Sequence, residues 1–180
     1  MQRATAHARR RSVQRIRRPI VIALLVGAAI AGGSGVLGGG ERATGPEHEA
    51  TVTRVVDGDT VVLSDLGKSR LIGIDTPEVY GDVECYGREA SAYAKRLLAG
   101  RRVRYAIGAE PRDRYGRALV YLWLGDGRFV NELLVTGGYA RTLEIAPNVR
   151  YAARLERRAS EARASGRGLW SPHACGAGPA

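Results

Sequence analysis

The middle of this chain alternates between short runs of β-branched or apolar residues and turn-forming segments. Valine, isoleucine and threonine are prominent in the first three runs, which predicts strands because branched side chains favour an extended backbone. The fourth run, and part of the fifth, alternate polar and apolar residues, which also predicts strands. The Asp-Gly pair at 57–58 and the polar segment 65–68 predict the turns between the first three runs. The predicted strands are residues 51–56, 60–63, 70–74, 102–107 and 118–124. The first three therefore form an antiparallel meander.

Apolar residues at helical spacing predict three helices around these strands. The first covers 87–99 and stops at Gly100, the second covers 129–135, and the third is capped by Asn148 and ends at Gly166. The apolar faces of the first and third comprise Ala90, Tyr93, Ala94, Leu97 and Leu98, and Tyr151, Leu155, Ala159 and Ala162, respectively. Five short strands with three helices predict a mainly β, α+β domain built on a small, partly open barrel that binds its ligand on one face.

The positive charge of the chain is concentrated at its N-terminus. The 180 residues carry a formal net charge of +10, and residues 1–18 contain seven arginines and no acidic residue, which leaves +3 for the rest. The apolar stretch 19–31 follows directly and ends in an Ala-x-Ala sequence. Two interpretations of residues 1–31 stay open: a signal peptide cleaved after 31, or an uncleaved membrane anchor. Arginines on the inner side orient both forms so that the domain is exported.

Composition divides the remainder of the chain into three parts. Residues 32–49 are rich in glycine and lack periodicity, which predicts a flexible linker. The folded domain is expected at 50–173, with a short tail at 174–180. Cys85 and Cys175 are the two cysteines of the chain. Two cysteines cannot build a tetrahedral zinc site by themselves, and in an exported chain a pair predicts a disulfide that ties the tail to the loop before the first long helix.

Two acidic motifs at the ends of predicted strands supply hard oxygen ligands. An Asp-Gly-Asp-Thr sequence by itself is usually a turn, but the Asp-Thr-Pro-Glu sequence in the same meander changes this interpretation. Calcium takes about six to eight oxygen ligands from carboxylates, carbonyls and water. Asp59, Asp75 and the main-chain carbonyl of Thr76 could provide three of them, with Pro77 biasing Thr76 toward an extended backbone. The pattern predicts a calcium site that leaves room for water and a phosphate oxygen.

Three further side chains suit phosphodiester hydrolysis. Glu78 follows Asp75 by three residues, where its carboxylate could orient or deprotonate an attacking water, although it could equally be a solvated loop residue. Arg70 ends the polar turn and opens an apolar strand, and Arg117 follows a Tyr-Gly turn. A guanidinium binds two phosphate oxygens at once, and two guanidinium groups can neutralise the charge that builds on a pentacoordinate phosphorus. This set of residue types predicts a metal-assisted phosphodiesterase.

Five motifs together are similar to the thermonuclease family, whose archetype is staphylococcal nuclease. They are Asp-Gly-Asp-Thr at 57–60, Arg-Leu-x-x-x-Asp-Thr-Pro-Glu at 70–78, Tyr-Gly-Arg-Glu-Ala at 86–90, Asp-Arg-Tyr-Gly-Arg at 113–117 and Gly-Leu-Trp at 168–170. The resemblance covers residues 50–171. It implies an OB-fold barrel with three helices, dependence on Ca²⁺, and endonucleolytic cleavage of DNA and RNA that leaves 3′-phosphates.

The resemblance also implies a role for individual residues. The positions matching the family's calcium ligands are Asp59, Asp75 and Thr76, and those matching its active-site residues are Arg70, Glu78 and Arg117. Tyr115 resembles the family's tyrosine near the terminal phosphate of the nucleotide, and we assign Tyr115 and Arg114 to substrate binding. The segment 79–85 is shorter than the archetype's loop and lacks its lysines, and 141–147 replaces the tyrosine-bearing stretch that helps hold the base. The catalytic set is intact while the binding surface differs.

We therefore expect an exported, calcium-dependent endonuclease that acts as a monomer on DNA and RNA with little sequence preference. It would be secreted into the extracellular space, or anchored in the membrane with the domain outside. A different class of function stays open: a non-catalytic OB-type module that binds nucleic acid or protein. Family members of that kind usually lose acidic or arginine positions, which this chain keeps. In a third interpretation, a membrane-anchored barrel serves envelope attachment.

Overall fold

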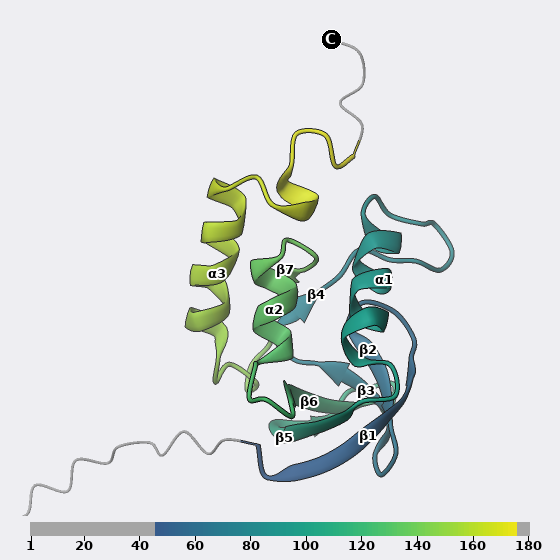
Figure 1. Ribbon diagram of the computed structural model, residues 1–180. Helices are drawn as coiled ribbons and strands as arrows, with labels where there is room; N and C mark the ends of the chain where they lie inside the picture. The colour runs from purple at the N-terminus through teal and green to yellow at the C-terminus, as the bar shows by residue number, and fades with distance from the viewer. Residues whose placement is uncertain (1–45, 176–180) are drawn as a thin grey trace, which may run out of the picture. The chain divides into compact units, whose positions relative to one another are not determined.

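The computed structural model describes residues 46–175. The predicted signal peptide or anchor at 1–31, most of the predicted linker, and the tail from residue 176 lie outside the described residues. Five strands form a closed barrel in the order β1-β2-β3-β6-β5 (Figure 1). The barrel strands are β1 (His48–Val55), β2 (Thr60–Leu63), β3 (Gly67–Leu71), β5 (Arg102–Arg112) and β6 (Ala118–Leu124). The predicted α+β, OB-fold architecture is confirmed.

Strand pairing explains why the barrel closes. Antiparallel pairs join β1 to β2, β2 to β3 and β5 to β6, β1 also pairs with β5, and β3 and β6 are parallel with Arg70 opposite Leu119. Register shifts interrupt β1 between Val52 and Arg54 and β5 between Ile107 and Arg112. Such bulges bend strands and increase their twist, which allows five strands to wrap round. The barrel is therefore closed where a partly open one was expected.

Three α-helices cover one side of the barrel, with α2 (Val130–Thr136) lying between α1 (Gly87–Leu98) and α3 (Ala152–Ala164) (Figure 1). The predicted apolar face of α1 is confirmed, because Ala90, Ala94 and Leu98 are fully buried. A short 3-10 helix, η1 (Gly168–Trp170), follows α3. The α2–α3 pair is reinforced by Glu132, which accepts hydrogen bonds from two arginines of α3. The helices thus share one apolar core with the barrel.

The strand predicted at 70–74 is wrong in its bounds. β3 ends at Leu71, and Ile74–Asp75 forms a separate short strand, β4, which pairs with β7 (Arg141–Thr142). Gly73 has φ +79°, a left-handed conformation that glycine adopts without the steric cost of a side chain, and the chain turns there. As a result Asp75 lies beside Arg141 in a two-stranded ladder outside the barrel.

Other predicted boundaries differ as well. β1 begins at His48, so residues 48–49, assigned to the linker, pair with β5 instead. β5 continues to Arg112 rather than ending at 107, because its bulge absorbs the irregular segment. Asn148 does not cap α3, whose N-cap is Tyr151. Its side-chain amide instead bonds both the main-chain N–H and the carbonyl of Glu110, at 2.9 and 3.0 Å, and ties this loop to β5.

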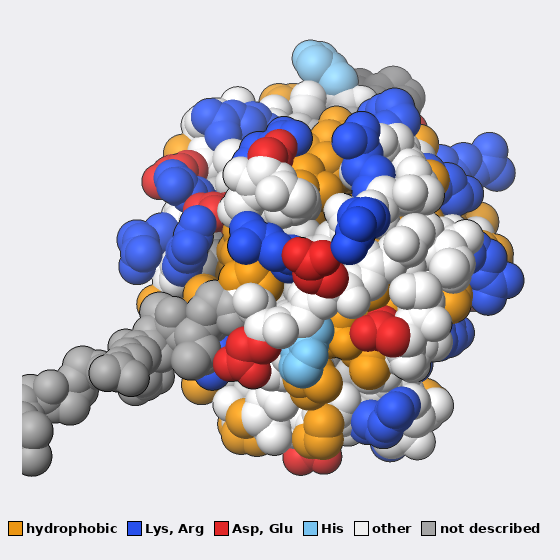
Figure 2. All heavy atoms as spheres, turned by 60° about the horizontal axis from the view of Figure 1, so that its bottom comes forward, with side chains coloured by type: hydrophobic (Ala, Val, Ile, Leu, Met, Phe, Trp, Pro, Cys, Tyr) orange, Lys and Arg blue, Asp and Glu red, His pale blue; other side chains and the backbone are white. Residues whose placement is uncertain are grey.

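On the face seen in Figure 2, arginine and lysine side chains lie among acidic side chains. Among residues 46–175, no helix has the length and apolar character needed to cross a membrane.

Candidate active site

The turn between β1 and β2 is shaped by Asp57. Its Oδ1 accepts hydrogen bonds from the main-chain N–H groups of Asp59 at 3.1 Å and Thr60 at 2.7 Å, the pattern by which aspartate stabilises a turn. Gly58 lies against Thr76, since a Cβ at this position would be 2.6 Å from the Thr76 hydroxyl oxygen. The absence of a side chain lets the turn approach Thr76 and directs Asp59 inward.

Asp59, Arg70, Asp75 and Thr76 are joined by direct bonds. Asp59 Oδ2 accepts hydrogen bonds from the Thr76 main-chain N–H at 2.8 Å and the Thr76 hydroxyl at 2.9 Å. The Arg70 guanidinium pairs through Nη1 with Asp59 and through Nη2 with Asp75 Oδ1 at 2.7 Å. The side chains of Arg70 and Asp59 are only 12% and 8% exposed. Four residues that the sequence predicted for the site are thus in contact.

Carboxylates outnumber cations around Arg70. Partial burial and the charge of Asp59 raise the pKa of Asp57. Partial desolvation and the charges of Asp57, Asp59 and Asp75 raise the pKa of Glu78, against the opposing effect of Arg70. The charges of Asp57, Asp59 and Asp75 thus all act on Glu78, while Arg70 pairs with two of these aspartates. This excess of hard, negatively charged oxygens fits a divalent cation such as calcium.

A cation at this point would need ligands other than carboxylates. Among the described residues, no group of three or more His, Cys, Asp and Glu side chains is arranged to hold a metal ion. Asp59 and Asp75 converge on Arg70, and Thr76, which follows Asp75, is bonded to Asp59 through its N–H and its hydroxyl. The donor set that would fit calcium is thus these two carboxylates, the predicted main-chain carbonyl of Thr76, and oxygens from water or phosphate.

Glu78 is exposed on a loop that is held in several places. The Glu84 main-chain N–H donates to the Glu78 carbonyl at 2.9 Å, and Glu84 Oε2 accepts from the Glu78 main-chain N–H at 3.3 Å. The Tyr80 hydroxyl donates to the Val56 carbonyl at 2.9 Å. A Cβ on Gly87 would lie 2.4 Å from the Glu78 carbonyl oxygen, so glycine lets the start of α1 pack against this loop. These contacts fix the main chain and leave the carboxylate free to face solvent.

Arg117 is positioned by Asp113 across a tight turn between β5 and β6. Asp113 Oδ2 accepts a hydrogen bond from Arg117 Nε at 2.6 Å, and Oδ1 accepts from the main-chain N–H groups of Tyr115 and Arg117, each at 2.9 Å. Desolvation acts to raise the pKa of Asp113, but the hydrogen bonds from Arg117 and Tyr115 outweigh it and lower the pKa. Within the described residues, the terminal nitrogens of Arg117 have no hydrogen-bond partner and are available to a phosphate.

Tyr115 is 68% exposed and lies between two arginines. The Arg114 guanidinium is 4.8 Å from the centre of the Tyr115 ring and donates to its hydroxyl at 2.6 Å. The Arg117 guanidinium is 5.5 Å from the same ring. The three side chains predicted to contact substrate on this loop therefore form one stacked group.

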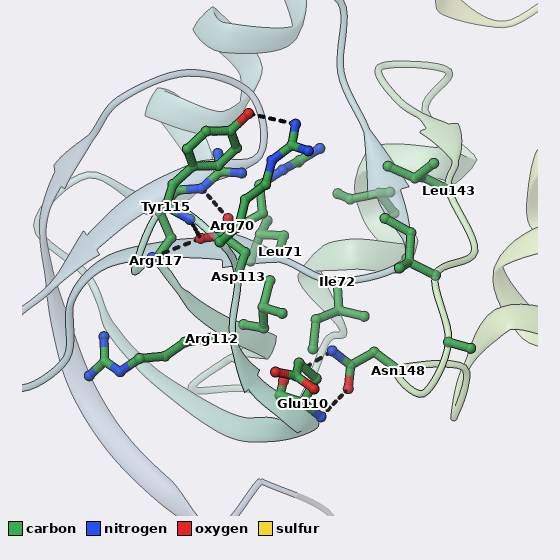
Figure 3. A pocket seen from close by; sticks show the side chains of 16 residues that line it. Arg70, Leu71, Ile72, Glu110, Arg112, Asp113, Tyr115, Arg117, Leu143 and Asn148 are labelled. Carbon is green, nitrogen blue, oxygen red and sulfur yellow. Dashed lines mark hydrogen bonds and ion pairs between the residues drawn. The ribbon is translucent and has the colours of Figure 1, made fainter.

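A cavity of about 550 Å³ brings the arginines together. Arg70, Arg114, Tyr115 and Arg117 line one part of it, and Figure 3 shows Arg70, Tyr115 and Arg117 close to one another there. The other part is walled by aliphatic side chains of the barrel and of the loop before α3. They include Ile72, Leu119, Leu143 and Ile145. The cationic and apolar parts together could hold a phosphate with its nucleoside.

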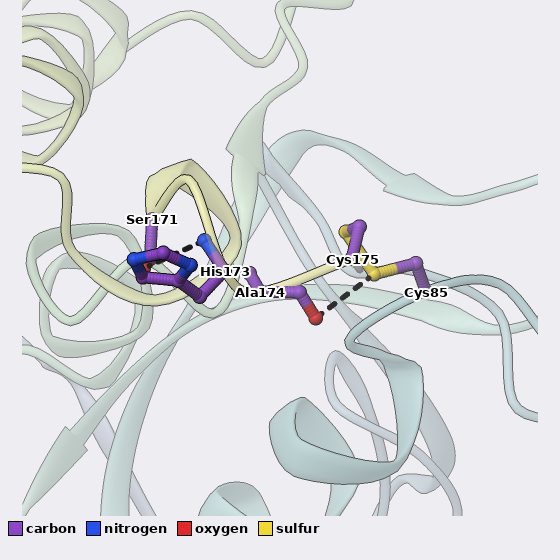
Figure 4. The surroundings of a disulfide bond; sticks show 5 residues. All are labelled: Cys85, Ser171, His173, Ala174 and Cys175. Atoms are coloured by element: carbon purple, nitrogen blue, oxygen red, sulfur yellow. Dashed lines mark hydrogen bonds between the residues drawn. A yellow bond between two sulfur atoms is a disulfide. The ribbon is translucent and has the colours of Figure 1, made fainter. Parts of the chain in front are cut away.

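A disulfide joins Cys85, in the loop that carries Glu78, to Cys175 (Figure 4). The two Cα atoms are 5.5 Å apart, and 90 residues separate them in sequence. The Cys85 sulfur also lies 3.4 Å from the carbonyl oxygen of Ala174. The bridge connects the loop before α1 to the segment after η1.

Several residues that shape the site were not singled out from the sequence. Asp113 was noted only as part of a motif, although an acid four residues before an arginine across a Tyr-Gly turn is a usable signal. Gly58, Gly87 and Glu84 act through contacts with residues that are distant in sequence or across a loop. Among these three residues, the sequence indicated a turn only at Gly58, through the Asp-Gly pair.

Comparison with known proteins agrees with this geometry. Residues 68–172 match the family described as staphylococcal nuclease homologue. The chain is 40% identical over 131 residues to a thermonuclease of Staphylococcus hyicus, which covers 69% of this chain and 77% of that protein. It is 41% identical over 125 residues to a thermonuclease of Staphylococcus intermedius, and this match covers 66% of this chain and 74% of that protein. A Bacillus subtilis endonuclease is 35% identical over 140 residues, which cover 69% of this chain but 12% of that protein. Because the match includes more than half of the chain, this protein belongs to the staphylococcal nuclease family.

Proposed function

We propose that this protein is an exported, calcium-dependent endonuclease that cleaves DNA and RNA with little sequence preference and leaves 3′-phosphates. Its membership of the family and its identity of about 40% with two thermonucleases make it a nuclease, a hydrolase of phosphodiester bonds. The observation that carries the finer proposal is the arrangement around Arg70. This guanidinium bridges Asp59 and Asp75 and shares a cavity with Arg117.

The two arginines and Glu78 divide the chemical work. Arg70 and Arg117 bind the non-bridging oxygens of the scissile phosphate and stabilise the charge that develops as phosphorus becomes pentacoordinate. Glu78 accepts a proton from the attacking water, the new P–O bond forms, and the bond to the 5′-oxygen breaks. The leaving oxygen takes its proton from solvent. The products are a 3′-phosphate and a 5′-hydroxyl.

The carboxylates beside Arg70 suit calcium as the cofactor. Asp59, Asp75 and the carbonyl of Thr76 would hold the ion. Bound calcium would supply positive charge that neutralises the two carboxylates and draws a phosphate oxygen into the site. The hydrogen bonds from Thr76 and Thr60 hold the Asp59 carboxylate in place for this role.

A digestion assay tests the proposal directly. Purified protein is incubated with single-stranded DNA, duplex DNA or RNA in calcium chloride or in excess chelator, and product ends are analysed by phosphatase sensitivity. We expect calcium-dependent cleavage of all three and 3′-phosphate ends, with a large loss of rate for Arg70→Ala. Cleavage that is unaffected by chelator, or 5′-phosphate products, would contradict the proposal.

Export of the domain is proposed from two features. The N-terminal segment 1–31 has the layout of a signal peptide or anchor, and a disulfide such as Cys85–Cys175 persists in oxidising compartments outside the cytoplasm. The protein would act as a monomer, either secreted or attached to the membrane with its domain outside, because all the proposed catalytic groups come from one chain. Fractionation of cells into medium, membrane and cytoplasm, followed by size-exclusion chromatography, tests this; an active cytoplasmic pool or an obligate oligomer would refute it.

A further inference from the structure

The cavity described above contains one acidic side chain in its apolar part. Arg70, Arg114 and Arg117 line its cationic part, and the aliphatic part extends from Ile72 to the exposed Leu143 and Ile145. Glu110 of β5 lies at the edge of this aliphatic part, next to Asn148 (Figure 3). A carboxylate beside an apolar wall is a feature that phosphate binding does not require.

The cationic and aliphatic parts of the cavity are adjacent. Arg70 and Ile72 are two residues apart, which is at most about 7 Å along the chain. Leu119 lies opposite Arg70 in the parallel pairing of β3 and β6 and continues the same wall. A nucleoside attached to a phosphate held by Arg70 can therefore reach these aliphatic side chains. With the base against this wall, its edge can reach the rim on which Glu110 lies.

The main chain of Glu110 is fixed while its carboxylate is free. The Asn148 side chain accepts from the Glu110 N–H at 2.9 Å and donates to its carbonyl at 3.0 Å. A Cβ on Gly108 would lie 2.6 Å from the Asn148 oxygen and 2.7 Å from Ile72 Cδ1, so the three segments are closely packed. The carboxylate itself makes no hydrogen bond or ion pair with the residues that the structure describes. Asn148 Oδ1 is already engaged, whereas the Glu110 carboxylate is an available acceptor at this edge.

A carboxylate discriminates among bases by their N–H groups. Guanine presents two parallel donors, N1–H and the 2-amino group, which match the two oxygens of a carboxylate. Thymine and uracil present a single N3–H between two carbonyl oxygens, which a carboxylate repels. We propose that Glu110 is a specificity-determining residue that favours guanine in the nucleotide whose phosphate is bound by Arg70 and Arg117. This inference rests on the proposed nuclease function and adds a preference at one position to otherwise non-specific cleavage.

Binding of two small probes tests the inference without cleavage. Titration calorimetry in calcium chloride compares the 3′,5′-bisphosphates of deoxyguanosine and thymidine. We expect the guanine compound to bind at least about tenfold more tightly, as a bidentate base contact allows. In Glu110→Ala the ratio should fall to within about twofold, and in Glu110→Gln it should fall substantially. Glu89→Gln removes the same charge from an exposed position on α1 and should leave the ratio unchanged.

The outcomes separate this inference from the nuclease proposal. Equal affinity of the wild type for the two probes, or a guanine preference that survives both substitutions of Glu110, overturns the role of Glu110 even if DNA is cleaved. Conversely, absence of cleavage with a guanine preference that Glu110→Ala abolishes would refute the nuclease mechanism and support the base contact. Circular dichroism of each variant shows whether it is folded, and Glu110→Gln provides a second test because it keeps the size of the side chain.

A cleavage assay gives an independent readout. Single-stranded oligonucleotides that carry one guanine in a thymine background are digested briefly, and the positions of the cuts are mapped on a gel. The wild type should cut one phosphate next to the guanine more often than each of the other phosphates, and Glu110→Ala should cut evenly along the strand. An even pattern in the wild type would overturn the inference.

Discussion

Replacing Asp113 with asparagine removes the acceptor that orients Arg117 while the turn keeps its shape. The asparagine oxygen can still accept from the main-chain N–H groups of Tyr115 and Arg117, which Asp113 Oδ1 accepts at 2.9 Å. At the Oδ2 position, however, an NH₂ group would face Arg117 Nε across 2.6 Å, donor against donor. The guanidinium must then turn away, so the change acts on the orientation of Arg117 rather than on the backbone.

The magnitude follows from the chemistry of this pair. A hydrogen bond to a charged group contributes about 1.5–3 kcal/mol, and the two side chains are only 24% and 16% exposed, so we expect Asp113→Asn to lower the free energy of unfolding by about that amount. Misplacing a catalytic group by about 1 Å can reduce the rate about 100-fold. We expect kcat to fall by roughly this factor, with a smaller change in KM because Arg70 still binds the phosphate.

The measurement combines steady-state cleavage of single-stranded DNA with urea unfolding. Asp126→Asn is a matched control, because Asp126 makes a similar pair with Arg128 at 2.8 Å on the exposed surface away from the cavity. Its kcat should equal that of the wild type. Since the pKa of Asp113 is lowered in the folded protein, its contribution to stability is present above the ordinary pKa of aspartate and is lost as the pH falls through the folded value. An unchanged kcat in Asp113→Asn, or an equal loss in Asp126→Asn, would refute the positioning role.

Three further predictions concern stability and can be checked by urea unfolding. Gly58→Ala should lower the free energy of unfolding by about 1–3 kcal/mol and reduce activity, because the new Cβ would lie 2.6 Å from the Thr76 hydroxyl oxygen. An unchanged free energy of unfolding would contradict this close packing. Reducing the disulfide, which spans 90 residues, should lower the free energy of unfolding by up to about 4–5 kcal/mol. An unchanged urea midpoint of unfolding would show that the bridge does not constrain the unfolded chain. Desolvation and the hydrogen bond to Asp65 raise the pKa of Tyr105 to about 12, so the unfolded chain ionises first. The free energy of unfolding should therefore fall by up to about 3 kcal/mol as the pH rises from 10 to above 12. Tyr105→Phe should lose this part of the pH dependence, and an equal slope of unfolding free energy against pH in the two proteins would refute the assignment.

The barrel could be predicted from local patterns, whereas its irregular parts could not. A β-branched run identifies β2, and an apolar and aromatic run identifies β6, both with their observed bounds. The break at Gly73 lies inside such a run, and the pairing of β4 with β7 joins segments that are far apart in sequence. Asn148 has the residue type of a helix cap, but a closer partner, the main chain of Glu110, competes for its side chain. Tertiary contacts override local preference at these points.

The candidate site shows the same division. The residue types at Asp59, Arg70 and Asp75 predict a cation and phosphate site, and the structure brings these side chains into direct contact. The sequence does not indicate that Arg70 joins the two carboxylates, since that depends on how β3 and β4 diverge at Gly73. Nor does it reveal that Gly87 allows α1 to approach the Glu78 loop. Geometry of this kind depends on close approach between segments.

The rate of single-stranded DNA hydrolysis in calcium chloride by Glu78→Gln, compared with Glu89→Gln, tests the central claim most directly. Both variants lose one carboxylate, but only Glu78 lies within the group of acidic residues around Arg70, while Glu89 is exposed in the first turn of α1. General-base catalysis typically contributes about 10²–10⁴-fold, so we predict a fall in kcat of that size for Glu78→Gln and a wild-type rate for Glu89→Gln. A wild-type rate in Glu78→Gln would contradict the account.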